Sequence, residues 1–501
     1  MKTDAGRSQL GRHALEGTDA ARQYDELKTY PVKVLQIGEG NFLRGFVDWM
    51  VDECNRKGLF RGGIAVTQPR PSGKAKLEQL ASQDGIYTLL TRGLLGGKRI
   101  EEERLITVFS RMIDPYSAWA EFLGLAESPD LEIVVSNTTE AGIRYEQVAL
   151  KPEEPIASFP GKLALLLYRR YEHYKGDPAK GLLILPCELL ERNGDELLRI
   201  VLQHAEDWKL PAPFSSWVRN HNRFLNSLVD RIVTGFPEQA ETYYDRWGYE
   251  DRMLNATEPY HFWAIEGEPA LGERLPFHKA GLNVQWVDDL TPFQTRKVRL
   301  LNGTHTLMAA IGRIHGVDEV KQVTEHPVWG PKLKAAMEQE LVPSVPISRE
   351  EALGYAESVW ERFRNPFIRH KLADISMNSI SKFKVRLLPS LKGYVQLHGV
   401  IPPTIAEGLA ALIRLYDVIR TDGEWLGQRL DGQRVPVKDD EEALALFEEA
   451  WARYRSGELE LSGLASDLLG SEKLWDENLN AITGLHEAVC GYLQEMELVE
   501  R

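Results

Sequence analysis

The sequence predicts an α/β fold for its first half and a mostly α-helical domain for its second half. Between about residues 30 and 280, short runs rich in β-branched residues alternate with segments of helical periodicity. Beyond about residue 280, amphipathic helical runs such as EEALALFEEAWARYR follow one another, and strand signals become scarce. Strands that alternate with helices favour right-handed βαβ units and a mostly parallel sheet.

The predicted strands of the first half end in small or polar residues. They lie in PVKVLQIGEG (31–40), GGIAVTQP (62–69), LEIVVSNTTEAG (131–142) and GLLILPCELLERNG (181–194). After the first strand, apolar residues at helical spacing from Phe42 to Val51 predict a helix that closes on Gly58. The polar residues 1–25 are expected to form a flexible arm.

Composition argues against several classes of protein. The chain has 501 residues, which predicts two or three domains. Its 60 Lys and Arg against 74 Asp and Glu give a net charge of −14, which disfavours binding to nucleic acid. The three cysteines lie far apart in the sequence, and no apolar run approaches the ~20 residues of a membrane span. We therefore expect a cytoplasmic protein without membrane or nucleic-acid partners.

Gly38-Glu39-Gly40 directly follows the first predicted strand and opens the first helix. Glycines in such a turn let backbone N–H groups approach the pyrophosphate of a dinucleotide at a helix end. The third glycine of G-x-G-x-x-G is Leu43 here, and an ordinary tight βα turn is the alternative interpretation. Because the turn follows the first strand, we predict a Rossmann-like dinucleotide-binding domain at 26–280 and a mostly helical substrate or catalytic domain at 281–501.

The choice between NAD and NADP is open from these residues alone. NAD enzymes usually place an acid at the end of the second strand, where it holds the ribose 2′-hydroxyl. Here that strand ends Val66-Thr67-Gln68-Pro69-Arg70, without a carboxylate. Arg70 could receive a 2′-phosphate, or it could be a solvated loop residue.

Three further segments occur in order along the chain: GEGNFLRGF (38–46), NSLVDRI (226–232) and KVRLLNGTH (297–305). Together they resemble the mannitol dehydrogenase family of polyol-specific long-chain dehydrogenases over roughly residues 30–400. The resemblance implies NAD as cofactor, no metal, and nucleotide contacts from Gly38, Gly40, Asn41, Phe42 and Arg44. Within the family, the chain is most similar to members that interconvert D-tagaturonate and D-altronate, which implies a sugar-acid substrate.

The resemblance also implies roles for the polar residues of KVRLLNGTH. Lys297 would be the general acid/base, because burial beside a cationic nicotinamide favours loss of its proton. Asn302 and Asn193 would stabilise the oxyanion, and His305 would hold the substrate oxygen and orient Lys297. If the segment is α-helical, His305 lies about 80° and Asn302 about 140° from Lys297 around the axis, so all three share one side.

Other assignments keep their alternatives. Mannitol-type members have Cys-Asp-Asn where this chain has Cys187-Glu188-Leu189, so Asn193 is our choice for the first oxyanion asparagine. Asp230 is a candidate for a substrate hydroxyl, although a buried structural network of Asp230 with Arg231 is an alternative.

A carboxylate site is predicted in SISKFKVRLLP, where three cations alternate with apolar residues as in a half-buried strand. Lys382 and Arg386 on that face are candidates for the substrate carboxylate. A solvated strand edge protected by charge is the alternative.

The leading hypothesis is an NAD(H)-dependent oxidoreductase of altronate and tagaturonate. Members of the same family that act on fructuronate or on mannitol would use the same catalytic set. From a different class, a nucleotide-binding regulatory protein could keep the fold without turnover. The presence of Lys297, Asn302 and His305 together argues against that alternative.

Overall fold

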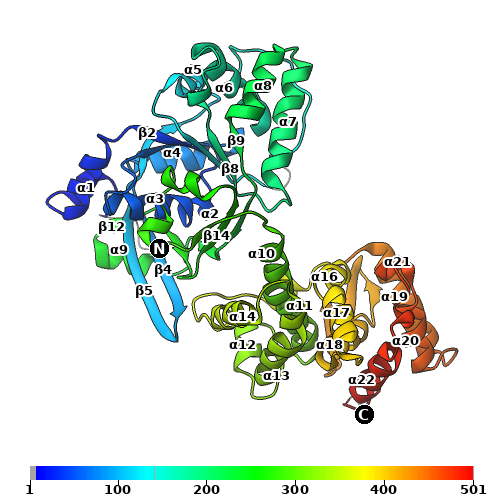
Figure 1. Ribbon diagram of the computed structural model, residues 1–501. Coiled ribbons are helices and arrows are strands. Elements are labelled where there is room, and N and C mark those ends of the chain that lie inside the picture. Colours follow the sequence, from blue (N-terminus) through cyan, green and yellow to red (C-terminus); the bar gives the residue numbers. More distant parts are fainter. Residues whose placement is uncertain (1–6, 140–141, 500–501) are drawn as a thin grey trace. The chain divides into compact units, whose positions relative to one another are not determined.

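The computed structural model describes residues 7–139 and 142–499, which form two compact units. Unit 1 runs to Gly93 and resumes over Arg99–Leu290, whereas unit 2 comprises Leu94–Lys98 and the chain from Thr291 onward. The expected domain boundary at 280/281 therefore falls inside unit 1. Figure 1 shows both units coloured along the sequence.

The centre of unit 1 is a six-stranded sheet in which all neighbouring strands are parallel. Its order is β6-β3-β2-β7-β8-β9, so the chain runs outward from β2 in both directions, as in a doubly wound nucleotide-binding fold. The strands are β2 Val32–Ile37, β3 Gly63–Thr67, β6 Phe109–Ile113, β7 Ile133–Ser136, β8 Leu183–Pro186 and β9 Arg223–Phe224. The four predicted strands are confirmed as β2, β3, β7 and β8, and the glycine turn follows β2, between β3 and β7.

Helices cover both faces of this sheet. Alternate residues of the strands enter two different cores, so that Val34 packs with α3 while its neighbour Leu35 packs with α6 and α7. In Figure 1, α6, α7 and α8 lie together beside β8 and β9. The helices are α2 Asn41–Arg44, α3 Val47–Arg56, α4 Lys74–Ser82, α5 Trp119–Gly124, α6 Phe159–His173, α7 Asn193–Asp207 and α8 Ala212–His221.

Smaller sheets complete unit 1. One has the order β11-β13-β4-β5 and another the order β10-β14-β15. Their strands are β4 Tyr87–Leu95, β5 Lys98–Ile106, β10 Ser227–Asp230, β11 Val233–Gly235, β13 Asn255–Thr257, β14 Phe262–Glu266 and β15 Val284–Val287.

The described part of the expected flexible arm is folded onto unit 1. Strand β1 (Ser8–Gln9) pairs with β12 (Tyr249–Glu250), near α9 (Ala240–Trp247). Helix α1 (Asp19–Leu27) packs through Ala21 and Tyr24 against Ile86. Residues 1–6 of that arm lie outside the described residues. The expectation of a flexible arm rested on the polar composition and overlooked the few apolar residues that pack this segment against unit 1.

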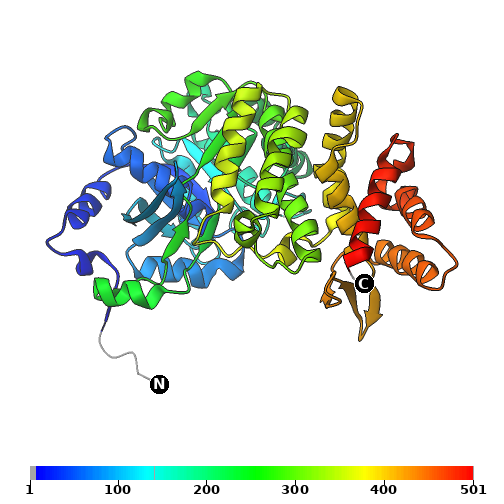
Figure 2. The ribbon, with the colours of Figure 1, turned by 90° about the horizontal axis from the view of Figure 1, so that it is seen from below.

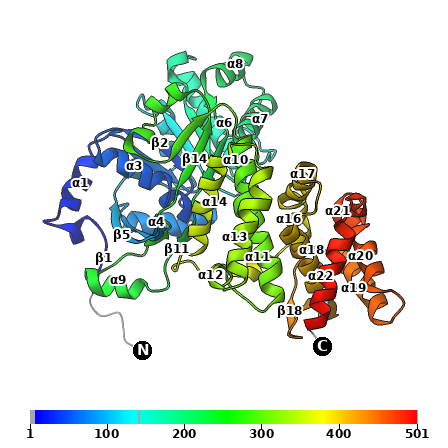
Figure 3. The ribbon, with the colours of Figure 1, turned by 60° about the horizontal axis from the view of Figure 1, so that its bottom comes forward.

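Unit 2 is mostly helical, as predicted. Its helices include α10 Thr291–Arg296, α11 Gly303–Ile314, α12 Val320–Glu325, α13 Trp329–Ala336, α14 Arg349–Phe363, α15 Leu372–Ile375, α16 Ser379–Arg386, α17 Leu388–His398, α18 Pro403–Leu415, α19 Glu441–Arg455, α20 Leu461–Leu469, α21 Glu472–Trp475 and α22 Leu485–Val499, with a small sheet of β16 Ile419–Thr421, β17 Glu424–Gln428 and β18 Arg434–Pro436. Every residue of α11 and every residue of α18 after Pro403 is buried, and the two helices pack on each other. Figures 2 and 3 show the red C-terminal helix α22 beside α18 and the orange α20.

Two segments of unit 2 differ from the prediction or assumption made for them. The segment SISKFKVR is not a strand but helix α16, because Ile380, Phe383 and Leu387 are buried at helical spacing while Val385 is 62% exposed. The segment Lys297–Asn302 is not α-helical but forms one stretch of π-helix between α10 and α11. Within the described residues, no helix has both the length and the apolar character needed to cross a membrane.

Candidate active site

The glycine turn of unit 1 depends on Gly38 for both conformation and space. Gly38 has a φ of +126°, which side-chain-bearing residues rarely adopt, and a Cβ there would lie 2.6 Å from the Asn137 carbonyl oxygen. Gly40 is the N-cap residue of α2, and a Cβ added to it would meet nothing within 4 Å. The turn therefore approaches β7 closely at Gly38 and leaves open space at Gly40.

The polar side chains after the turn are engaged within unit 1. Arg44 is buried and donates to the carbonyl of Met253 and, at 2.6 Å, to Asn41 Oδ1. Asn41 is fixed further by its carbonyl, which accepts from Asn255 Nδ2 at 2.9 Å. Phe42 stacks on Phe46 with ring centroids 5.0 Å apart. These contacts hold the shape of the turn, and Arg44 is a structural part of it.

The ends of β3 and β6 meet beside the glycine turn. Gln68 is fully buried and donates from Nε2 to Asp114 Oδ1 at 2.7 Å. Arg70 is exposed and donates to Thr139 Oγ1 at 3.2 Å. Nearby, the Nζ of the buried Lys162 lies within hydrogen-bonding distance of four oxygens, including the Pro69 carbonyl at 2.9 Å, and burial lowers its pKa to about 7. The loops at this edge are thus tied together by buried hydrogen bonds.

In unit 2, the motif residues lie on the π-helix and the first turn of α11. A π-helix pairs each N–H with the carbonyl five residues earlier, as Gly303 N–H does here with Val298. Lys297 and Asn302 are five residues apart, so one π-turn brings them nearer to each other around the axis than an α-helix, which would separate them by about 140°. The π-turn brings the two motif positions together on one side of the helix.

His305 is buried in unit 2 among aromatic rings. Its ring centroid lies 4.4 Å from that of Phe363 and 4.7 Å from that of His370, which it meets edge to face. Burial lowers the pKa of His370, which favours its neutral form. Neither Phe363 nor His370 was predicted, because each lies more than fifty residues beyond the motif and carries no signature of its own.

The cations of α16 divide between two faces, because residues four apart share a helix face and residues two apart do not. Arg386 donates to Thr306 Oγ1 at 3.3 Å, next to His305 on α11. Lys382 donates to the Ile375 carbonyl at 2.7 Å. Lys384 instead pairs with Asp476 at 2.9 Å. The structure thus places Arg386, of the three, beside the motif helix.

Asn193 is the first residue of α7 and is buried in unit 1. Its Nδ2 lies 3.1 Å from each of the carbonyl oxygens of Pro186, Glu188 and Ser227. Its Oδ1 accepts from the N–H groups of Gly194 and Ser227 at 2.9 and 3.0 Å. The Asn193 amide therefore ties the end of β8 to the start of β10.

Asp230 ends β10 and is buried in unit 1. Its neighbour Arg231 donates to the carbonyls of Glu258 and Gly45 and lies 4.1 Å from the centre of the Trp49 ring. Burial lowers the pKa of Arg231 to about 9. Arg231 thus ties this strand end to the helix that follows the glycine turn.

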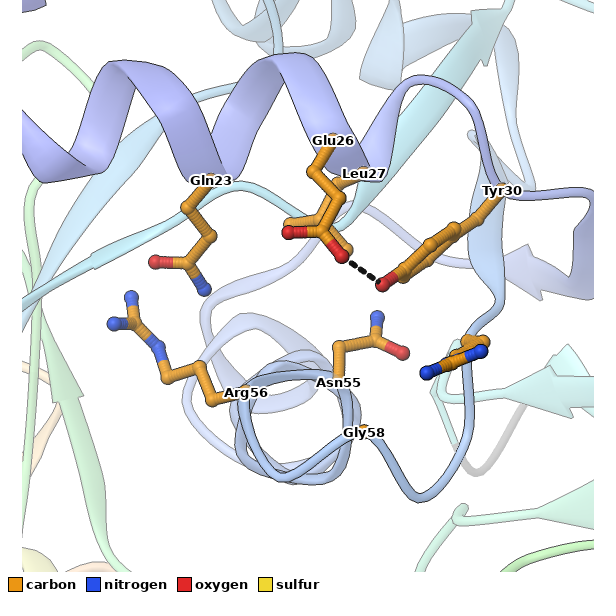
Figure 4. Close-up of a pocket in the computed structure, with 8 residues that line it drawn as sticks. Gln23, Glu26, Leu27, Tyr30, Asn55, Arg56 and Gly58 are labelled. Atoms are coloured by element: carbon orange, nitrogen blue, oxygen red, sulfur yellow. Dashed lines mark hydrogen bonds between the residues drawn. The ribbon is translucent and has the colours of Figure 1, made fainter.

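Unit 1 also has a polar hollow of about 390 Å³ between α1 and the end of α3. Figure 4 shows Glu26 and Tyr30 on the α1 side of this hollow, with Asn55 and Arg56 of α3 facing them; Tyr30 donates to Glu26 at 2.7 Å. None of the predicted site residues lines this hollow. Among the described residues, no group of three or more His, Cys, Asp or Glu side chains is placed to hold a metal ion.

Comparison with known proteins settles the family. The Mannitol dehydrogenase Rossmann domain matches residues 32–279, and the Mannitol dehydrogenase C-terminal domain matches residues 289–497. The chain belongs to the mannitol dehydrogenase family. The resemblance drawn from the three motifs is confirmed.

Individual members of the family cover nearly the whole chain. An altronate oxidoreductase of Bacillus subtilis (strain 168) is 41% identical over 94% of this chain and 94% of its own length. One of Halalkalibacterium halodurans is 40% identical over 93% of this chain and 90% of its own. Among solved structures, D-sorbitol dehydrogenase matches with a TM-score of 0.71 and 21% identity, covering 92% of this chain and 96% of its own. Pseudomonas fluorescens mannitol 2-dehydrogenase, in a ternary complex with NAD and D-mannitol, matches with a TM-score of 0.65 and 21% identity, covering 95% and 94%. The solved structures support the fold.

Proposed function

We propose that this protein is an NAD(H)-dependent oxidoreductase that interconverts D-altronate and D-tagaturonate. The observation that carries the proposal is the identity of about two residues in five with altronate oxidoreductases over 93–94% of the chain. The motif residues Lys297, Asn302 and His305, which this chemistry needs, are all present.

The glycine turn fits a dinucleotide. It follows β2, with β3 on one side and β7 on the other, where strand order reverses and doubly wound folds bind nucleotides. Gly40 keeps open the space that a side chain would occupy, so the backbone at Gly38, Gly40 and Asn41 can face a pyrophosphate. Phe42 would line the same turn. Arg44 would hold the shape of the turn through its hydrogen bond to Asn41 Oδ1. When bound, the cofactor accepts or returns the hydride of the reacting carbon.

Lys297 supplies the acid and base. In oxidation of altronate its amine takes the hydroxyl proton, and in reduction of tagaturonate its ammonium returns that proton to the carbonyl oxygen. Asn302, one π-turn away, donates to the same oxygen as negative charge develops. His305 is held by Phe363 and His370, so its ring can keep one orientation toward the substrate oxygen.

Asn193 supports the site in a different way. Since its amide protons already serve main-chain carbonyls, we infer that it positions the start of β10 and does not act as an oxyanion donor. Asp230 lies at the other end of β10 and remains our candidate for a substrate hydroxyl.

The substrate carboxylate requires a cation. Arg386 fits best, because its guanidinium reaches α11 one residue from His305 and can bind a carboxylate through two N–H groups. Lys382 lies one helical turn earlier on the same face and would add charge.

The test follows NADH absorbance with tagaturonate, fructuronate and fructose, and NAD reduction with altronate. We expect turnover with tagaturonate and altronate, with kcat/KM for tagaturonate at least about tenfold above that for fructuronate. Turnover on fructose with none on uronates would indicate a polyol dehydrogenase. Binding of NADH without turnover on any of them would contradict an enzymatic role.

A further inference from the structure

The end of β3 lacks the acid that usually holds the adenosine ribose, yet the side chain there is rigidly held. Gln68 donates to Asp114, whose carboxylate also accepts from Tyr116 N–H at 3.0 Å and from Ser117 Oγ at 2.8 Å. Gln68 Oε1 is buried and has no hydrogen-bond partner among the described residues. Gln68 therefore presents a fixed acceptor at the place where the ribose of a dinucleotide is expected.

A carboxylate reaches the same place from the glycine turn. A Cβ added to Gly73 would lie 2.8 Å from Glu39 Oε1 and 2.5 Å from Gln68 Cβ, so both side chains pass over Gly73. Gly73 has a φ of −76°, which any residue can adopt. Position 73 needs glycine for lack of space and not for its backbone conformation, because a side chain there would displace Glu39 and Gln68.

The Glu39 carboxylate is buried, as is the nearby Arg44, whereas two other nearby cations are exposed. Glu39 is 9% exposed and faces Arg44 and Lys76, and burial raises its pKa. Lys76 and Arg70 are exposed, so solvent and salt screen them more than the buried carboxylate. Solvent therefore screens the Glu39 carboxylate less than these two cations. The buried Arg44 already donates to the Met253 carbonyl and to Asn41 Oδ1.

We propose that Glu39, with Gln68, accepts the hydroxyls of the adenosine ribose and selects NAD against NADP. The inference rests on the proposed function, because it takes the dinucleotide to lie on the glycine turn. A carboxylate accepts hydrogen bonds from both ribose hydroxyls, whereas it repels the 2′-phosphate of NADP. The acid missing from the end of β3 is thus supplied from within the G-x-G turn.

The test measures dissociation constants of NADH and NADPH by nucleotide fluorescence, without sugar, for the wild-type protein and three variants. In Glu39→Gln, we expect NADH to bind about tenfold more weakly and the ratio of the NADPH to the NADH constant to fall at least about tenfold. In Gly73→Ala, which adds no charge, we expect NADH binding about fivefold weaker because Glu39 and Gln68 are displaced. The control Glu78→Gln removes an exposed carboxylate of α4 and should leave both constants within about twofold.

The outcomes separate this proposal from the function on which it rests. A Glu39→Gln protein that unfolds like the wild type and keeps the wild-type ratio within twofold would overturn the assignment of Glu39. If Glu39→Gln does not fold, unchanged NADH binding in Gly73→Ala overturns it instead. A wild-type protein that binds neither nucleotide would contradict the proposed function itself.

Discussion

The glycine turn of unit 1 and the motif helix of unit 2 are built in opposite ways. In the turn, Arg44 and Asn41 form hydrogen bonds inside the unit. The part of the turn that borders open space is the backbone at Gly40. In the motif helix, the backbone itself is altered by a π-turn, and the proposed functional groups are side chains. The difference teaches that side-chain deletions should affect turnover in unit 2 and affinity or stability in unit 1.

Lys297→Ala should have the largest effect of these changes. We expect kcat to fall at least about a thousandfold, because the reacting hydroxyl loses its proton acceptor. NADH affinity should stay within about twofold, because Lys297 lies outside unit 1. Steady-state kinetics measures kcat and NADH titration measures the affinity, with Lys384→Ala as a surface lysine control. A variant with more than a tenth of wild-type kcat would remove Lys297 from the acid/base role.

Asn302→Ala sharpens the comparison with Asn193. Loss of one oxyanion donor should lower kcat about a hundredfold, or ~3 kcal/mol, without changing the unfolding midpoint. Asn193→Ala should instead lower the free energy of unfolding by about 1–3 kcal/mol, since it leaves several buried main-chain groups unpaired. Urea unfolding and kcat are measured on both variants. If Asn193→Ala is as stable as the wild type yet loses a hundredfold in kcat, the oxyanion role returns to Asn193.

Arg386→Ala should have a smaller and more selective effect. We expect KM for tagaturonate to rise about tenfold, because a charge-assisted hydrogen bond to the carboxylate is lost. KM for an uncharged ketose, where that substrate is turned over, should change less than about twofold. Lys384→Ala is the matched control, because Lys384 is on the same helix but pairs with Asp476. Equal increases for both substrate types would place the carboxylate elsewhere.

Regular structure was predictable from the sequence where burial repeats. Val34-Leu35 and Val134-Val135 are strand residues buried on both faces, so continuous apolar runs identify β2 and β7. SISKFKVR misled because Ile380 and Phe383 fit a helical period while the charges alternate at a period of two. In this segment, the packing of the apolar residues determines the secondary structure, and the spacing of the charges does not.

The candidate site was only partly predictable, for two physical reasons. Motif spacing identifies Lys297 and Asn302, but not the one-residue shift in hydrogen bonding that forms the π-turn. Asn193 satisfies a spacing rule, yet its buried amide pairs with three carbonyls that no local pattern could reveal. The sequence shows Glu39 as an acid inside G-x-G. Only the structure shows that its carboxylate lies over Gly73 beside Gln68, which is the basis for its proposed role.

The smallest predicted effect concerns pH and His261 in unit 1. Its Nε2 accepts from Asn283 N–H at 3.0 Å, its ring meets Trp49 edge to face, and burial together with the charge of Arg231 lowers its pKa to about 4. Because the folded protein binds this proton less readily than the unfolded chain, stability is retained above about pH 6.5 and declines as the pH falls toward 4. Urea unfolding at about pH 7 and about pH 5 should show a larger loss for the wild type than for His261→Gln. The exposed His13 provides a control, since His13→Gln should follow the wild type. An equal loss in the wild type and His261→Gln would mean that protonation of this imidazole does not weaken the folded unit 1, and that the Asn283 contact survives it.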